Sequence, residues 1–324
     1  MNPKALIVGI SGQDGGYLAK LLLDKGYEVH GTSRDGTASP CGNLELLGVK
    51  HRITLHSVAL SEFKSVFSVI DLVRPRELYN LAGQSSVGLS FTVPMETFES
   101  IAVGTWNLLE CLRMLKLPIM LFNAGSSEVF GNTPQGGSEE TLFRPRSPYA
   151  TAKAAAHYSV ANYREAYDLF CCTGMLFNHE SPLRPARFVT KKIVAAAARI
   201  KLGSPEKLPL GRIDIQRDWG WAPEYVEAMW LMLQQNKPDD YVIATGVSTS
   251  LQDYVAKVFE HLDLNWRDFV TLSPGLQRPS DIDISFGQTA KAERILGWKA
   301  KVQLPEITAR MVEEELRLQR DQKP

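Results

Sequence analysis

The chain of 324 residues carries 36 Lys and Arg against 36 Asp and Glu, so its formal charge is zero. This balance excludes a general electrostatic attraction to nucleic acid or to an anionic membrane, and any anionic ligand must be held by local groups. Hydrophobic residues make up 44% of the chain and charged residues 22%, which is typical of a globular protein and excludes disorder or a collagen-like repeat.

Apolar runs and cysteines indicate the compartment. No run approaches the roughly 18 apolar residues that cross a bilayer, and the apolar stretch at the start is too short for a signal-peptide core. The four cysteines, Cys41, Cys111, Cys171 and Cys172, form no CxxC pair. We therefore expect buried, reduced thiols in a cytoplasmic protein without membrane contact.

Short apolar segments alternate with amphipathic segments over the first 180 residues, which is typical of repeated βαβ units. The predicted strands are Ala5–Gly9, Glu28–Thr32, Ile53–Ser57, Glu77–Asn80, Ile119–Asn123 and Cys171–Leu176. The predicted helices are Gly16–Lys25, Glu62–Val73, Met95–Leu115 and Pro148–Asp168. The pattern predicts an α/β fold with a doubly wound parallel (Rossmann) sheet, whose ligand site lies at the carboxyl ends of the strands.

A glycine-rich turn follows the first predicted strand and opens the first predicted helix. Its glycines, Gly9, Gly12 and Gly15, have GxxGxxG spacing. Glycines here allow a tight turn and a close approach to a pyrophosphate, whose charge the helix N-terminus stabilises. At this place in a βαβ series the turn predicts a dinucleotide site rather than a plain β–α connection.

Arg34 lies just beyond the second predicted strand, where the chain passes the adenosine ribose. A guanidinium there pairs with a 2′-phosphate, whereas an acidic residue accepts from a free 2′-hydroxyl. Arg34 therefore favours NADP over NAD, although Asp35 follows it directly. A solvated loop charge is the alternative role.

Tyr149 and Lys153 are four residues apart at the start of a predicted helix and share one face. An ammonium close to a phenol stabilises the phenolate, so we expect Lys153 to lower the pKa of Tyr149 and allow proton exchange near neutral pH. A bare YxxxK is common on exposed helices. After a glycine-rich turn and a fifth strand, the pair predicts catalysis.

Ser126 and Glu128 follow the fifth predicted strand, at the same sheet edge as the glycines. In an extended segment, residues two apart project to the same side. Ser126 can hydrogen-bond a substrate hydroxyl. Glu128 offers a base that simple alcohol oxidation by a Tyr/Lys pair does not require, and a local cap or salt bridge is its alternative role.

The strict alternation fades after Asn178, where loops rich in Pro, Arg and Gly intervene. We expect an NADP-binding Rossmann domain over residues 1–178 and a smaller, intertwined substrate-binding part over residues 179–324. The final segment, 305–324, begins as an amphipathic helix and ends polar, which predicts a packed last helix with a frayed tail.

Several long segments together resemble the GDP-mannose 4,6-dehydratases, a branch of the extended short-chain dehydrogenase/reductase family. They include GISGQDGGYLAKLLLDKGYEVHG, YNLAGQSSV, SSEVFG, RPRSPYATAK, LFNHESP and RDWGWAPEYVEAM. The likeness runs from Lys4 to about Leu316. It implies an NADP-dependent lyase, a homodimer or homotetramer, that converts GDP-mannose to GDP-4-keto-6-deoxymannose by internal hydride transfer and water elimination.

The resemblance also implies roles for individual residues. The catalytic positions are Ser126, Glu128, Tyr149 and Lys153. The cofactor positions are Gly9, Gly12, Gln13, Asp14, Gly15, Arg34, Leu60, Leu81, Gln84, Ser85, Lys153, His179 and Arg184. The nucleotide-sugar positions are Ser85, Asn178, Lys192, Arg217 and Arg278. Cationic side chains suit a diphosphate because each contact is charge-assisted, although each arginine alone is as consistent with a structural ion pair.

Five positions depart from the family. Ser126 stands for a catalytic threonine, and Asp35 for a second arginine in a loop that reaches a neighbouring subunit's cofactor. Ala59, Glu96 and Trp221 stand where aspartate, tyrosine and histidine are common. The change at Asp35 weakens the case for NADP and for a tetramer formed through that loop. The five changes together weaken the assignment of the exact sugar more than that of the reaction type.

Other functions remain open at this stage. An epimerase or a 4-ketoreductase shares the glycine turn, Tyr149 and Lys153, and only Glu128 with the LFNHESP and RDWG segments favours dehydration. The sequence does not distinguish a GDP-mannose 4,6-dehydratase from a GDP-heptose 4,6-dehydratase. A non-catalytic cofactor-sensing protein is expected to have lost Tyr149 or Lys153. The six histidines form no HExxH motif or close cluster, so no metal site is predicted.

Overall fold

A seven-stranded sheet with parallel neighbours forms the centre of the computed structural model, which describes residues 2–36, 41–276 and 278–321. Its strand order is β11-β6-β5-β4-β1-β2-β3. The strands are β1 (Lys4–Val8), β2 (Glu28–Ser33), β3 (Thr54–Ser57), β4 (Glu77–Asn80), β5 (Met120–Ala124), β6 (Cys171–Leu176) and β11 (Tyr241–Ile243). The predicted α/β fold with a doubly wound parallel sheet is confirmed, with one strand more than expected.

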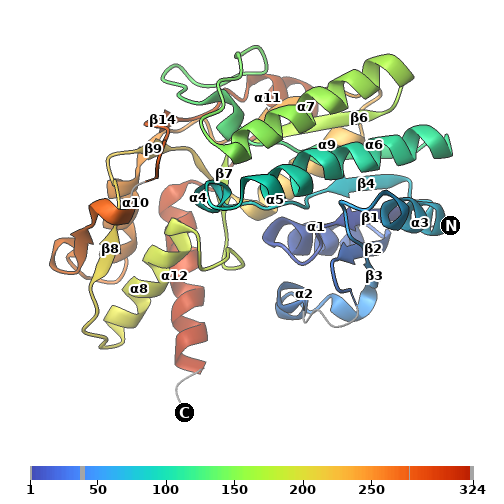
Figure 1. Ribbon diagram of the computed structural model, residues 1–324. Helices are drawn as coiled ribbons and strands as arrows, with labels where there is room; N and C mark the ends of the chain where they lie inside the picture. The colour runs from blue at the N-terminus through green and yellow to red at the C-terminus, as the bar shows by residue number, and fades with distance from the viewer. Residues whose placement is uncertain (1, 37–40, 277, 322–324) are drawn as a thin grey trace.

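Helices bury both faces of the sheet, as parallel sheets require. Cores on its two faces join it to α1 (Gln13–Asp24) and α9 (Ala222–Leu233) on one side, and to α3 (Phe63–Val73) and α6 (Gly104–Leu115) on the other. Helix α7 (Pro148–Tyr167) packs beside α6, and Figure 1 shows the two lying side by side along the sheet.

The chain returns to the sheet after residue 178. Strand β11 pairs with β6, placing Tyr241 opposite Gly174, and Tyr225 and Met229 of α9 lie in the same core as α1. A three-residue strand is too short for its periodicity to distinguish it from a loop, which is why the sequence did not predict it.

The predicted helix Met95–Leu115 is interrupted. It consists of α5 (Pro94–Phe98), a π-helical turn η2 (Glu99–Val103) and α6. The turn packs on the loop after β4, where a Cβ on Gly83 would lie only 2.8 Å from Ile101 Cγ1. There Gln84 N donates to Ser100 Oγ at 3.2 Å. The π turn thus shapes a loop that holds two predicted cofactor residues, Leu81 and Gln84.

A second core forms from the C-terminal half, where α8 (Val189–Lys201), α10 (Leu251–Glu260) and α12 (Leu304–Asp321) pack together. Figure 1 shows them beside the sheet, with the pair β8 (Leu208–Leu210) and β13 (Val270–Leu272). The predicted packed last helix is present as α12. Its predicted frayed tail falls on residues 322–324, which lie outside the described residues.

Two small sheets complete the C-terminal half. Strand β7 (Asn178–Glu180) pairs with β10 (Trp219–Trp221), and β9 (Gln216–Arg217) lies between β12 (Thr249–Ser250) and β14 (Ile284–Ser285). The remaining helical segments are α2 (Gly42–Leu46), η1 (Lys50–Arg52), α4 (Val87–Ser90), η3 (Ser127–Phe130), η4 (Trp266–Asp268), η5 (Pro274–Leu276) and α11 (Ala290–Leu296).

Cys111, Cys171 and Cys172 are buried free thiols, and Cys41 is buried as well. Within the described ranges, no helix combines the length and apolarity that crossing a membrane requires.

Candidate active site

The turn between β1 and α1 requires glycine at two positions, because the backbone there either has a positive φ or is closely approached by other backbone atoms. Gly9 has φ +88°, and a Cβ there would lie 2.9 Å from the backbone of Ala82. A Cβ on Gly15 would lie 2.6 Å from Gly9 O. These two glycines let the start of α1 approach the ends of β1 and β4.

Gly12 differs, because neither its backbone nor its described neighbours require glycine. Its φ is −73°, and a Cβ would meet only Gly9 O, at an ordinary 3.5 Å. Gly12 is exposed and begins α1 without a side-chain cap. The missing side chain leaves open access to the first N–H groups of the helix, which favour an anion. The turn therefore fits a dinucleotide pyrophosphate.

A buried polar network joins this turn to β7. Gln13 Nε2 donates to His179 O at 3.1 Å, and Ser181 Oγ donates to Gln13 Oε1 at 2.8 Å. His179 Nε2 lies 2.9 Å from Asp14 Oδ2, while its Nδ1 lies 2.7 Å from Phe177 O. Burial alone lowers the pKa of His179, but the charge and hydrogen bond of Asp14 raise it above its ordinary value. Both ring nitrogens of His179 thus lie against oxygen acceptors, and these contacts favour the protonated ring.

Tyr149 and Lys153 lie in the first turns of α7 and are both buried. The helix starts there because Ser147 Oγ accepts from Ala150 N at 3.1 Å and Pro148 occupies the first turn. Lys153 Nζ donates to Ala124 O at 2.7 Å and lies 5.8 Å from the centre of the Tyr149 ring. The helix thus places the pair over the end of β5.

The expectation that Lys153 lowers the pKa of Tyr149 is wrong for the protein alone. Burial raises the pKa of Tyr149 to about 12, with the charge of Glu128 adding to it and a hydrogen bond with Ser126 opposing it. The ammonium is directed to Ala124 instead, and burial lowers the pKa of Lys153 to about 8. Spacing predicted the shared face but not the desolvation, which dominates here.

Glu128 lies in the 3₁₀ turn η3, so the predicted extended segment is wrong as well. Ser126 caps this turn, with its Oγ accepting from Glu128 N at 3.3 Å. Burial raises the pKa of Glu128, while the charges of Arg217 and Arg278 lower it in part. The charge of Glu128 also raises the pKa of Tyr149, so the carboxylate lies within electrostatic reach of the phenol.

The two arginines that face Glu128 are joined by an acidic residue that the sequence did not reveal. Arg217 is only 5% exposed, and its Nη2 lies 2.9 Å from Asp281 Oδ1. Arg278 Nη1 lies 3.4 Å from the same oxygen. Arg217 Nη1 also donates to Ile282 O at 2.7 Å. The sequence hinted at this ion pair only through the spacing of Asp281, which lies three residues after Arg278. The contact with Arg217 joins distant segments, and such contacts leave no local pattern.

One further predicted residue, Arg184, lies shortly before the start of α8. Arg184 Nε lies 3.2 Å from Glu180 Oε2, and its guanidinium stacks 3.8 Å from the centre of the Phe188 ring. The charge of Arg184 lowers the pKa of both Tyr149 and Asp14, so Arg184 lies within electrostatic reach of both groups.

The other predicted residues lie farther along the strand ends. Ser85 Oγ accepts from Arg187 Nη2 at 3.1 Å, a partner that the sequence did not suggest. Leu81 N donates to Val8 O at 2.9 Å, and Leu60 O accepts from Asn107 Nδ2 at 2.9 Å. These hydrogen bonds hold the backbone of Leu81 and of Leu60 close to the carboxyl ends of the strands.

Three predicted residues stand apart from this group. Arg34 is exposed just after β2, and Asn178 begins β7 beside Trp219. Lys192 Nζ donates to Pro209 O at 2.7 Å, within the C-terminal helical body. Within the part of the chain that the structure describes, no hydrogen bond or ion pair joins these three to Glu128 or Tyr149, so their assignment depends on the resemblance.

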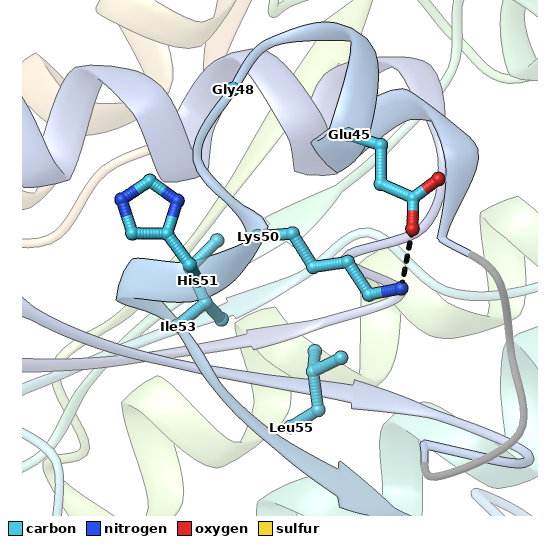
Figure 2. Close-up of a pocket in the computed structure, with 6 residues that line it drawn as sticks. All are labelled: Glu45, Gly48, Lys50, His51, Ile53 and Leu55. Carbon is cyan, nitrogen blue, oxygen red and sulfur yellow. Dashed lines mark hydrogen bonds and ion pairs between the residues drawn. The ribbon is translucent and has the colours of Figure 1, made fainter.

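Figure 2 shows a surface hollow whose described lining contains none of the candidate site residues. The described residues that line it are Glu45, Gly48, Lys50, His51, Ile53 and Leu55. It lies between α2 and the edge strand β3, and Lys50 and Glu45 pair across it at 2.7 Å. The catalytic candidates instead come from η3 and α7, so this hollow is separate from the site.

The Asp14–His179 pair predicts a pH window for stability. Burial raises the pKa of Asp14, but His179, Gln13 and Arg184 lower it overall below 3.8, while the pKa of His179 is raised above 6.5. The pair's contribution is therefore fully present between those two values. It is lost as pH falls through the folded pKa of Asp14 or rises through that of His179.

Melting temperatures of the unaltered chain and Asp14→Asn across this pH range measure that contribution. The difference between the two curves should be largest inside the window and shrink on both sides. Asp24→Asn, which removes an exposed helix carboxylate 3.1 Å from Lys20, is the matched control. A difference that does not change with pH would contradict the ion pair.

Comparisons with known proteins agree on one family. Residues 6–311 match the family model described as GDP-mannose 4,6 dehydratase. The chain is 46% identical to GDP-mannose 4,6 dehydratase 1 of Arabidopsis thaliana, covering 98% of this chain and 91% of that protein. It is 42% identical to the GDP-mannose 4,6-dehydratase of Sinorhizobium fredii, covering 96% of each. A UDP-glucose 4-epimerase from Thermus thermophilus, solved with NAD, superposes with a TM-score of 0.84 at 26% identity, covering 96% of this chain and 98% of that one. The chain therefore belongs to the GDP-mannose 4,6-dehydratase family.

Proposed function

We propose that this chain is a lyase that converts GDP-mannose to GDP-4-keto-6-deoxymannose and water. The observation that carries the proposal is the shared site of Glu128, Tyr149 and the arginines Arg217 and Arg278. A phenol that removes a proton from an alcohol is enough for oxidation or reduction. A second, half-buried carboxylate near cations that would bind a diphosphate supports an elimination on a nucleotide-sugar.

Tyr149 acts on the C4 hydroxyl of the sugar. In its phenolate form it takes the hydroxyl proton as C4 becomes a ketone. Positive charge from Arg184 and the hydrogen bond with Ser126 favour that form against the cost of burial. Ser126 would also hold the C4 oxygen, a role that the hydrogen bond of its hydroxyl with Tyr149 supports.

Glu128 performs the elimination. The 4-ketone acidifies the hydrogen on C5, which Glu128 removes as a proton. Burial raises the pKa of Glu128, so its carboxylate is a stronger base than an exposed one. The same carboxyl can then protonate the C6 hydroxyl, which leaves as water. A single group with a raised pKa thus suits both halves of the step.

We propose NADP as the cofactor. When bound, it would supply the hydride acceptor for C4 and the hydride donor for C6. The turn at Gly9, Gly12 and Gly15 would hold the pyrophosphate, and Arg34 the 2′-phosphate. The remaining positions proposed for cofactor contact are Gln13, Asp14, Leu60, Leu81, Gln84, Ser85, Lys153, His179 and Arg184.

The proposed substrate contacts come mainly from the second half of the chain. Arg217 and Arg278 would pair with the diphosphate, with Asn178, Lys192 and Ser85 along the rest of the nucleotide-sugar. We propose residues 1–178 as the main cofactor-binding part and residues 179–324 as the main substrate-binding part. The proposal also places the chain in the cytoplasm, which agrees with the buried free thiols of Cys111, Cys171 and Cys172.

Glu128→Gln tests the reaction directly. Removing the base should lower kcat by about 10²- to 10⁴-fold, because a general base contributes on that scale. Mass spectrometry of GDP-mannose incubated with the protein should show loss of one water for the unaltered chain and little for the variant. NADP binding, measured by calorimetry, should be unchanged.

Glu140→Gln is the matched control, because Glu140 is an exposed glutamate of the following loop. It should keep full turnover. Full turnover by Glu128→Gln would remove Glu128 from the role of base. No water loss by the unaltered chain with NADP would refute the proposed function itself.

Arg34→Ala tests the cofactor preference. Losing one charge-assisted phosphate contact should raise the Kd for NADP by about 10- to 100-fold. The Kd for NAD should stay within about twofold, since NAD lacks the 2′-phosphate. Arg294→Ala, at an exposed arginine of α11, is the control. An equal change for both cofactors would exclude the 2′-phosphate contact.

We propose that the chain forms a homo-oligomer through the outer face of α5, α6 and α7. Exposed apolar side chains gather there, with Met95 69%, Trp106 56% and Tyr158 60% exposed. Helices α6 and α7 are joined on this face, because Trp106 Nε1 donates to Ser159 Oγ. Large apolar side chains exposed on neighbouring helices support an interface between subunits on this side of the protein.

Trp106→Glu should shift the oligomer toward a 36.1 kDa monomer, because an interface would then bury an unpaired charge. Analytical ultracentrifugation of the unaltered and variant chains measures the mass. Leu46→Glu, at an exposed leucine of α2, should leave the mass unchanged. A monomeric unaltered chain, or an unchanged mass for Trp106→Glu, would contradict this interface.

A further inference from the structure

The chain segment that follows Glu128 is tied to a strand from the far end of the sequence. Asn132 Oδ1 accepts from Asp283 N at 2.7 Å and from Ile284 N at 3.2 Å. Thr133 N donates to Ile284 O at 2.9 Å. Thr133 Oγ1 donates to Phe286 O and accepts from Phe286 N, both at 3.1 Å. Residues 132–133 therefore form one edge contact of strand β14.

The other edge of β14 carries the arginine site. Strand β14 pairs with β9, which places Arg217 opposite Ser285. Asp218 N donates to Ser285 O at 2.9 Å, and Gln216 N donates to Asp283 O at 2.7 Å. Asp281 and Arg278 precede β14 by a few residues. Strand β14 thus lies between residues 132–133, which follow the turn that carries Glu128, and strand β9, which carries Arg217.

We propose that Asn132 and Thr133 are positioning residues that fix the separation between the Glu128 carboxylate and the Arg217–Asp281–Arg278 cluster. This inference rests on the proposed function, in which Glu128 acts at C5 of the sugar and the arginines bind the diphosphate. In a nucleotide-sugar these two points are a limited distance apart. A base held at the right distance from the diphosphate meets C5 rather than a neighbouring carbon.

Tyr149 is held by a different set of contacts. Its helix is anchored by the Ser147 cap and by Lys153 at Ala124 O, neither of which involves β14. Loosening residues 132–133 should therefore spare the proton transfer at C4. It should slow the removal of the C5 proton by Glu128, and with it the departure of the C6 hydroxyl as water.

The two residues suit substitution in different ways. Asn132 is exposed, so Asn132→Ala removes its amide contacts without opening a cavity. Thr133 is 4% exposed, and Thr133→Val removes its hydroxyl with little change in volume. Thr133→Ser keeps the hydroxyl and should restore the behaviour of the unaltered chain. Asn236→Ala, at an exposed asparagine after α9, is the control.

The experiment follows two steps of the reaction separately in the full chain loaded with NADP. After addition of GDP-mannose, the absorbance of reduced nicotinamide reports C4 oxidation, and mass spectrometry reports water loss. Calorimetry with GDP alone tests the arginine site, and the melting temperature tests folding. In Asn132→Ala and Thr133→Val, kcat for water loss should fall about 10- to 100-fold.

Reduced nicotinamide should accumulate in these two variants, while the Kd for GDP stays within about twofold. Unchanged water loss, or an equal slowing of both steps without accumulation, would overturn the inference. So would a tenfold weaker affinity for GDP, because the residues would then support the arginines alone. If the unaltered chain forms no product, the proposed function fails. The Kd of the variants for GDP then shows separately whether residues 132–133 affect the arginine site.

Discussion

The half-buried carboxylate of Glu128, whose charge interacts with those of Arg217 and Arg278, is the constraint on which the rest of the site depends. Burial favours the protonated form, and the guanidinium groups favour the ionised form. The two effects oppose each other, so the carboxylate stays ionisable while its basicity is raised. The sheet half supplies Glu128 and the C-terminal half supplies the arginines, so this electrostatic balance exists only when both halves are folded together.

Local patterns predicted the elements that form by local rules. Six strands of the sheet and the helix that carries Tyr149 and Lys153 could be found, because buried parallel strands are apolar runs and α7 begins at a serine cap with proline. Strand β11 and the π-helical turn Glu99–Val103 could not. A three-residue strand has no readable period, and a π turn depends on its packing against Gly83.

The candidate site was predictable in its residue types but not in its energetics. The glycine spacing indicated a phosphate-binding turn. The structure adds that neither the backbone conformation at Gly12 nor the packing of its described neighbours requires a glycine there. The pKa of Tyr149 was expected to fall, yet burial raises it. Desolvation depends on every segment packed around a group, and Asp281 reaches Arg217 from 64 residues away. Neither leaves a trace in a short stretch of sequence.

The return of the chain to β11 has a consequence for the folding of this protein. Strand β11 covers the edge of β6 that would otherwise terminate the sheet, and it is synthesised long after β6. Until residues 241–243 emerge, the nascent sheet presents a row of unpaired backbone groups beside the apolar Cys171–Leu176 segment. Such a row is a template for pairing with another chain, so the period between the two strands is when the polypeptide is most exposed to aggregation.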